Sequence, residues 1–167
     1  MAAVTTLPAA FVANTVLTAA QLNDLRGAFR VLQVVSANYG TQASNTTTTY
    51  ADTGLTATIT PSATSSKILV LVNQAGVAKG GASAASGCDI SLFRGVTNIS
   101  QFAYGAGYTA TASSNFLGSS SSLFLDSPAT IAATTYKTQF KNQVASDGVT
   151  VQVGNCVSNI VLMEISA

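Results

Sequence analysis

Hydrophobic and polar residues alternate with a period of two over much of the chain beyond residue 32, which is the pattern of half-buried strands. Gly-, Ser- and Thr-rich stretches separate the alternating segments and indicate turns and loops. The pattern predicts strands at residues 31–37, 55–60, 67–72, 88–93, 99–104, 122–125, 135–141, 149–153 and 160–165. Short strands at this regular spacing are typical of a β-sandwich, and we expect a jelly roll.

The predicted strand at 67–72 differs from the others because it has no polar alternation. A Ser- and Thr-rich turn, residues 62–66, precedes it, and Ile68 to Val72 then form an unbroken apolar run. Strands that read as continuous apolar runs are buried on both faces. We therefore expect one face of this strand to contact the domain's own core and the other face to contact a second surface.

A helical pattern precedes the strands. Thr18 and Gln21 have the spacing of a capping box. Four apolar residues then follow three, four and three positions apart, which is the spacing of a helical seam: Leu22, Leu25, Phe29 and Leu32. Two heptads are too short to be stable alone in water. The helix is expected either to pack on its own domain or to associate with copies of itself at a symmetry axis.

The change of period divides the chain into two parts. Residues 1–17 show no periodicity and are expected to extend as an arm before the helix. The expected organisation is an N-terminal arm and amphipathic helix over residues 1–35, used for attachment or trimerisation, followed by a β-sandwich over residues 36–167.

Charge is scarce in this 167-residue chain. Only 8% of the residues are charged and the net charge is +1, with the basic residues scattered. Nucleic-acid binding is not expected, because it requires clustered Lys and Arg.

Mean hydropathy is positive at +0.39. However, no apolar run approaches the roughly 20 residues that span a bilayer, and no secretory signal is evident. Membrane insertion is not expected, and the low charge is compatible with a permanent subunit interface.

Candidate catalytic chemistry is sparse. The sequence contains no His, so Ser–His and Cys–His nucleophile pairs are unavailable. Asp52 lies in an Asp-Thr-Gly triplet like that of aspartic proteases, but that chemistry needs two such carboxylates and only one copy is present. We expect neither an enzyme nor a cofactor. A distant carboxylate pair for glycoside cleavage, and Ca²⁺ at Asp89 or Asp126, remain open alternatives.

Two further features leave alternatives open. Cys88 and Cys156 either form one long-range disulfide or are buried free thiols.

Four aromatic residues lie among Gly, Ala and Ser, and they suit stacking on sugars or on a protein partner. They are Phe102, Tyr104, Tyr108 and Phe116. Alternatively, these aromatics cap the sandwich core or fill a subunit interface.

Two segments resemble structural proteins of tailed bacteriophages. "FVANTVLTAAQLNDLRGAFRVLQVV" resembles the short N-terminal element of phage tail-appendage proteins. The region that opens with "YADTGLTATITPSATSSKILVLVNQ" and closes with "IVLMEI" is similar to a compact β-domain of small virion and tail-fibre proteins. The resemblance implies homotrimers with jelly-roll heads of the tumour-necrosis-factor-like kind, with N-termini at the particle and C-terminal domains outward.

These observations lead to an expected function. The chain is expected to be a trimeric virion surface appendage, a tail fibre or receptor-binding knob, exposed on the particle and attached by its N-terminus. The expected trimer-interface strand carries Ile68, Val70 and Val72, and the expected partners are its own copies, other virion proteins, and a host surface glycan or protein. A capsid decoration (cement) protein is the main alternative, and a glycan-degrading or proteolytic enzyme is a distant one.

Overall fold

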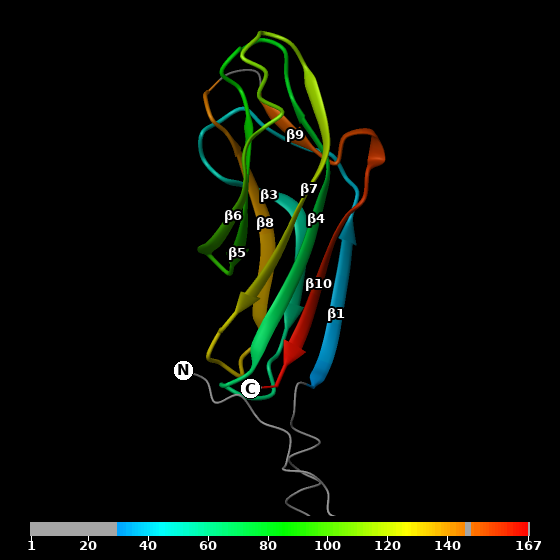
Figure 1. Cartoon of the computed structure of the whole chain (residues 1–167), viewed down its shortest axis with the longest axis vertical. Helices are drawn as coiled ribbons and strands as arrows, with labels where there is room; N and C mark the ends of the chain where they lie inside the picture. Colours follow the sequence, from blue (N-terminus) through cyan, green and yellow to red (C-terminus); the bar gives the residue numbers. More distant parts are fainter. Residues whose placement is uncertain (1–29, 146–147, 167) are drawn as a thin grey trace, which may run out of the picture.

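Two antiparallel β-sheets pack face to face in an elongated sandwich (Figure 1). The computed structural model describes residues 30–145 and 148–166. The strands of the first sheet are β1 (Val31–Tyr39), β2 (Ala43–Asn45), β4 (Lys67–Lys79), β7 (Asn115–Asp126), β9 (Val149–Val151) and β10 (Ser158–Ile165). The strands of the second sheet are β3 (Ala51–Ile59), β5 (Cys88–Arg94), β6 (Thr97–Ala106) and β8 (Thr134–Asn142). In this part of the chain the remaining regular element is a 3-10 turn, η1 (Val153–Asn155).

The strand order is that of a jelly roll. In the first sheet β10 lies between β1 and β4, and β7 pairs with the other edge of β4. The short strands β9 and β2 continue the sheet beside the far end of β4. The second sheet has the order β3-β8-β5-β6. Without the short strands β2 and β9, the orders β1-β10-β4-β7 and β3-β8-β5-β6 are those of the two four-stranded sheets of a jelly roll, as the sequence predicted.

The period of two is confirmed in β3, β8, β9 and β10, whereas β5 is buried on both sides and β6 does not alternate. In β8, Tyr136 and Phe140 are fully buried, whereas Lys137 and Gln139 are partly exposed. Several strands extend beyond their predicted ends, most of all β7, which begins at Asn115, and β4, which continues to Lys79. The three-residue strand β2 was not predicted.

The core has two apolar clusters with a polar layer between them. The larger cluster gathers residues of both sheets around Ile68, Leu162 and Tyr136, and the smaller one surrounds Ile90 and Phe140. Buried polar side chains from β3, β8, β4 and β10 form the layer: Thr53, Thr138, Gln74 and Ser158. These side chains are joined by hydrogen bonds of 2.6–2.9 Å, so the layer ties the two sheets together.

The predicted N-terminal helix lies outside the described residues, and so do Leu22, Leu25 and Phe29 of its apolar seam. The fourth seam residue, Leu32, lies in β1 and is 39% exposed, so its assignment to a helix is wrong. Because β1 begins at Val31, residues 31–35 belong to the sandwich and not to the N-terminal part.

Candidate functional site: the outer face of the first sheet

The three residues predicted to line a trimer interface point into the protein's own core. Ile68, Val70 and Val72 are at most 4% exposed and belong to the larger apolar cluster. The prediction is therefore wrong for these side chains. Because successive side chains of a strand point to opposite faces, Leu69 and Leu71 lie on the outer side of the sheet, where both are partly exposed.

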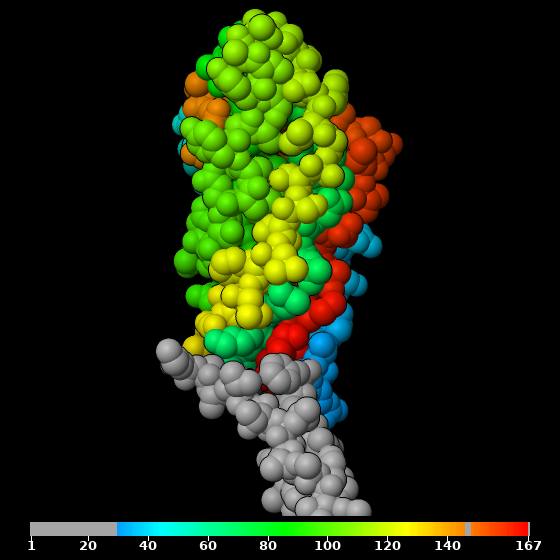
Figure 2. All heavy atoms as spheres, viewed as in Figure 1, coloured from blue at the N-terminus to red at the C-terminus, as the bar shows by residue number. Residues whose placement is uncertain are grey.

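Apolar side chains continue across the outer side of four neighbouring strands. One cross-strand row runs from β1 to β7 through Val34, Met163, Leu69 and Leu125. The next row runs through Ser36, Val161, Leu71 and Leu123. We call the following eight residues the apolar face: Val34, Leu69, Leu71, Leu123, Leu125, Val161, Met163 and Ile165. In Figure 2 the atoms of β7, β4, β10 and β1 form adjacent yellow, green, red and blue bands over this part of the molecule.

In the isolated chain the apolar face is open to solvent at its two edges, β1 and β7, and its residues on β4 and β10 are partly exposed. Leu123, Leu125 and Val34 are 68%, 55% and 56% exposed. The eight residues contribute no charge, and Lys67 lies at the margin, where its ammonium group donates a hydrogen bond to Ser127. An uncharged, contiguous apolar surface of this kind is typical of a contact site for another protein surface.

A polar row bounds the apolar face on the side toward η1. It consists of Asn38, Asn159, Asn73 and Ser121. Ser121 donates a hydrogen bond of 2.9 Å to the amide oxygen of Asn73. A hollow of about 340 Å³ opens between this row and Leu71 and Leu123. The surface therefore has an apolar centre, a depression and a polar margin, which is the usual anatomy of a protein–protein contact.

The predicted surface aromatics divide into two groups. Phe102 is half-buried and packs against both apolar clusters, so it contributes to the core. Tyr104, Tyr108 and Phe116 are 81%, 54% and 68% exposed. Tyr104 and Tyr108 line a second hollow, together with Gly105 and Gln143.

The carboxylates of the described chain are engaged in separate structural contacts. Asp126 accepts hydrogen bonds from Arg94 and from the hydroxyl of the buried Tyr136, at 2.8 and 2.6 Å. Burial raises the pKa of Tyr136, and the hydrogen bond to Asp126 raises it further.

Glu164 is fully buried. Burial alone would raise its pKa, but the hydrogen bonds that it accepts outweigh burial and lower the pKa to about 2. The donors are the backbone N–H and hydroxyl of Ser62, the side chain of Ser66 and that of Gln33.

The Asp-Thr-Gly triplet forms an irregularity in β3. The β3–β8 register shifts between Asp52 and Thr56, and Gly54 has a φ of +90°. A Cβ at Gly54 would overlap the ring of Tyr39, so this position requires glycine. Asp52 itself forms an ion pair of 2.8 Å with Lys137. Burial acts to raise its pKa, but hydrogen bonds from Lys137 and Gln139 more than offset that effect and the pKa is lowered.

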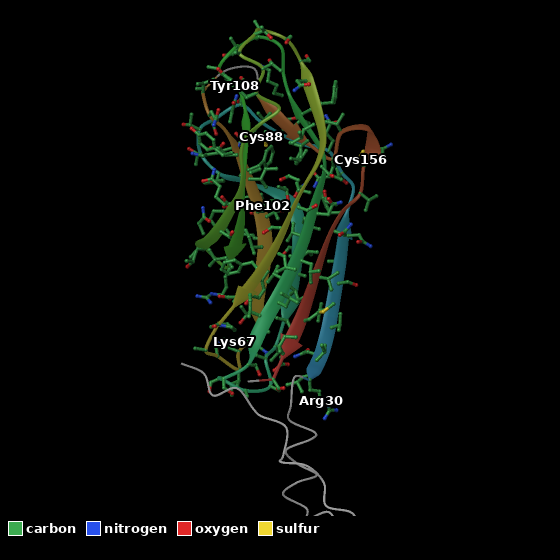
Figure 3. All side chains as sticks on the ribbon, in the orientation of Figure 1. Arg30, Lys67, Cys88, Phe102, Tyr108 and Cys156 are labelled. Carbon is green, nitrogen blue, oxygen red and sulfur yellow. The ribbon has the colours of Figure 1, made fainter. Side chains whose placement is uncertain are left out.

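The two cysteines are not bonded to each other. Cys88 is buried in the smaller apolar cluster, and Cys156 is exposed beside η1 (Figure 3). Burial raises the pKa of the Cys88 thiol, and the neighbouring Asp89 adds to this shift. Of the two alternatives drawn from the sequence, the disulfide is wrong and the buried free thiol is confirmed for Cys88 alone.

The described residues contain neither a cluster of metal-binding side chains nor a membrane-spanning helix. No group of three or more His, Cys, Asp or Glu side chains in residues 30–145 and 148–166 could hold a metal ion. Over the same ranges, no helix is long and apolar enough to cross a membrane.

Comparison with known proteins yields little. No protein-family model matches the sequence, and no curated protein matches it. Among solved structures, the chain is similar to that in the crystal structure of the infectious bursal disease virus VP2 subviral particle, at 12% identity and a TM-score of 0.31. The match covers 80% of this chain and 41% of that one, so this chain spans about two fifths of the other's length. A likeness at this TM-score carries no information about activity or partners.

Proposed function

We propose that this chain is a non-enzymatic structural protein of a bacteriophage virion, which assembles as a homotrimer and is attached through its N-terminal segment. On this proposal it serves as a surface appendage, a tail fibre or receptor-binding knob. The phage and trimer parts of the proposal derive from the resemblance of the two sequence segments quoted above. The structural observation that carries self-assembly is the apolar face on β7, β4, β10 and β1.

The size of the apolar face supports self-assembly. Four strands about 4.8 Å apart, each contributing about two outward side chains over about four residues at about 3.3 Å per residue, cover roughly 250 Å². A standard interface buries about 800 Å² per partner and has an apolar centre with a polar rim. The apolar face thus has the size of the centre of such an interface, and the polar residues around it would supply the rim.

The composition of the apolar face favours identical copies as its partner. An identical copy presents the same uncharged surface, so association leaves no buried charge without a partner. The non-enzymatic part of the proposal is supported by the carboxylates, because Asp52, Asp126 and Glu164 are each engaged in contacts that hold the sandwich together.

A capsid decoration protein is the second candidate. Apart from Tyr108, the loop between β6 and β7 contains small uncharged residues, among them Thr109, Ala110 and Ser113, which offer few specific contacts to a receptor. This composition suits a protein that covers a capsid surface, and such a protein could use the same apolar face to form trimers.

Two measurements test the proposal. Size-exclusion chromatography with light scattering on the full chain is expected to give three times the 16.9 kDa mass of one chain. A stable monomer would overturn the assembly. Labelling the protein on intact phage particles tests its location: a few copies to some tens support a tail appendage, hundreds support decoration, and none would overturn the virion role.

A further inference from the structure

A second candidate site lies far from the apolar face, at the other end of the sandwich. It is a hollow of about 320 Å³ lined by Tyr104, Gly105, Tyr108 and Gln143. Tyr104 and Gly105 belong to the end of β6, Tyr108 follows that strand, and Gln143 follows β8. In Figure 3 Tyr108 lies at the end opposite to Arg30. The site is therefore at the end of the sandwich opposite to Arg30, where the described part of the chain begins.

The backbone fixes the two tyrosines relative to each other. The N–H of Tyr108 donates a hydrogen bond of 2.9 Å to the carbonyl of Gly105, which closes a tight turn. Gly105 and Gly107 adopt φ angles of +62° and +81°, which glycine allows without strain. Tyr104 is 81% exposed and Tyr108 is 54% exposed, so ring surface is available to a ligand on both sides of the turn.

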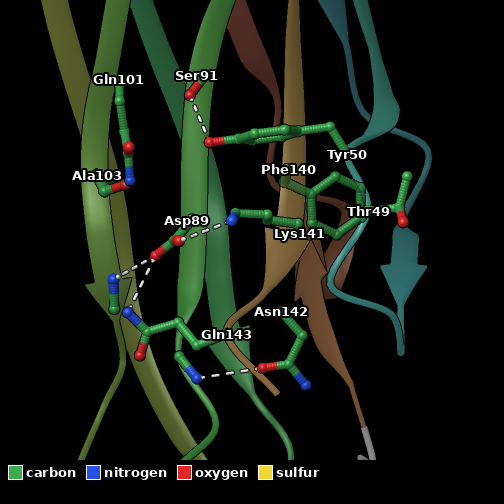
Figure 4. Close-up of polar contacts among 12 residues, drawn as sticks. Thr49, Tyr50, Asp89, Ser91, Gln101, Ala103, Phe140, Lys141, Asn142 and Gln143 are labelled. Carbon is green, nitrogen blue, oxygen red and sulfur yellow. Dashed lines mark hydrogen bonds and ion pairs between the residues drawn. The ribbon is translucent and has the colours of Figure 1, made fainter. Parts of the chain in front are cut away.

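Gln143 supplies an oriented polar group beside these rings. Its side-chain N–H donates to the carboxylate of Asp89 at 3.2 Å (Figure 4). Its backbone N–H donates to the carbonyl of Gly87 at 3.1 Å. The same oxygen of Asp89 accepts a hydrogen bond of 2.8 Å from the backbone N–H of Gly105. Because the Gln143 N–H faces Asp89, the amide oxygen is the atom that can accept a hydrogen bond from a ligand.

The side chains that line the hollow carry no charge, which favours a neutral ligand. Tyr104, Tyr108 and Gln143 are uncharged, and the neighbouring carboxylate of Asp89 is 3% exposed and lies 3.7 Å from the ammonium group of Lys141. Among the described residues, no cation lines the hollow to attract an acidic ligand. Its volume is at the lower limit of small-molecule sites, which occupy about 300–1,000 Å³.

We infer that this hollow binds a neutral pyranose of a glycan, with the tyrosine rings against the apolar C–H face of the sugar and Gln143 accepting a hydrogen bond from a hydroxyl or N-acetyl group. Aromatic rings beside a small number of fixed polar groups suit such a ring, which has apolar faces and a polar rim. The inference deepens the proposed function, on which it depends only for the source of the glycan, the surface of the host cell.

Saturation-transfer difference NMR on the full chain tests this inference. The probes are the methyl glycosides of glucose, galactose, mannose, N-acetylglucosamine and N-acetylgalactosamine. We expect saturation of the ring protons of at least one sugar. Tyr104→Ala, Tyr108→Ala and Gln143→Ala should each weaken binding of that sugar roughly three- to tenfold. Tyr104→Phe should bind nearly as well as the wild type, because it retains the ring.

Phe116→Ala is the matched control, because Phe116 is also an exposed aromatic but does not line the hollow. It should leave sugar binding unchanged. Absence of saturation transfer from all five sugars would overturn the inference, as would undiminished binding by the Tyr104→Ala/Tyr108→Ala double variant. Light scattering on the same samples separates the two proposals: a trimer without sugar binding refutes only this inference, and a sugar-binding monomer refutes only the proposed assembly.

Discussion

Leu69 of β4 and Leu125 of β7 are direct cross-strand partners, and both side chains project from the outer side of the sheet. On the inner side of the same two strands, Val70 pairs with Phe124, and both contribute to the core. The β4–β7 ladder is thus apolar on two sides. Burial of one side accounts for folding of the sandwich, and the other side is available for association.

A charge on the apolar face should prevent assembly. Leu125→Asp places a carboxylate on an apolar surface that becomes desolvated on association, at a cost of several kcal/mol. Because Leu125 is 55% exposed in the single chain, the fold should tolerate the change. Light scattering should then report the mass of one chain. Val96→Asp, at a side chain that is 94% exposed and lies outside the apolar face, should leave the mass of the assembly unchanged. Equal masses for the two variants would contradict the proposed interface.

Glu164 should make stability depend on pH. Its folded-state pKa of about 2 lies below the ordinary value of 4.5, so its ionised form stabilises the fold above pH 4.5. That stabilisation should be lost as the pH falls from 4.5 toward 2. Urea unfolding of the wild type and Glu164→Gln should therefore show a difference in unfolding free energy that is constant from pH 7 to 5 and shrinks below pH 4.5. A difference that stays the same down to pH 2.5 would contradict this role.

The two thiols should differ in reactivity. Cys156 is exposed, whereas Cys88 is buried and its pKa is raised, so its thiolate form is rare at neutral pH. Titration with a thiol-specific chromogenic reagent at pH 8 should modify one thiol per native chain and two per chain in denaturant. Cys156→Ser should abolish the native reaction. Two rapidly reacting thiols in the native protein would show that the smaller apolar cluster opens readily.

The polar layer should contribute to stability through Thr138. Its hydroxyl donates to the Gln74 amide oxygen at 2.9 Å and lies 2.6 Å from the hydroxyl of Thr53. Thr138→Val leaves buried polar atoms without this partner, and we expect a loss of about 1–3 kcal/mol in unfolding free energy. Thr135→Val on the same strand breaks only an exposed contact with Thr58 and should cost less than about 0.5 kcal/mol. Urea unfolding measures both variants, and equal losses would show that the layer is not a specific source of stability.

The strands and their inward-facing residues could be predicted wherever polar residues mark one face. In β8 the alternation of Tyr136 and Phe140 with Lys137 and Gln139 identified the buried side directly. The run from Ile68 to Val72 has no polar residue, so the sequence could indicate burial on two sides but not which residues lie on which side. That ambiguity is why Ile68, Val70 and Val72 were assigned to the wrong surface.

Other features depend on contacts between residues distant in sequence. The strand β2 lies in a Ser- and Thr-rich stretch without alternation, and it forms because it pairs with β9 more than 100 residues later. The polar layer requires Gln74 and Ser158 to meet from β4 and β10, and neither residue is unusual in its local sequence. The exposed tyrosines were identified from their small neighbours, whereas the place of Gln143 beside them follows only from the fold.

The position of β10 between β1 and β4 has a consequence for the timing of biosynthesis. The ribosome makes β10 after the strands that it joins, so until it emerges the outer surface exists only as two separate portions, β1 on one side and β4 with β7 on the other. Val161 and Met163 complete that surface in the final step. A nascent chain therefore cannot present the finished outer surface to its neighbours on the same messenger RNA, and one edge of β4 lacks its β10 partner until the last strand is made.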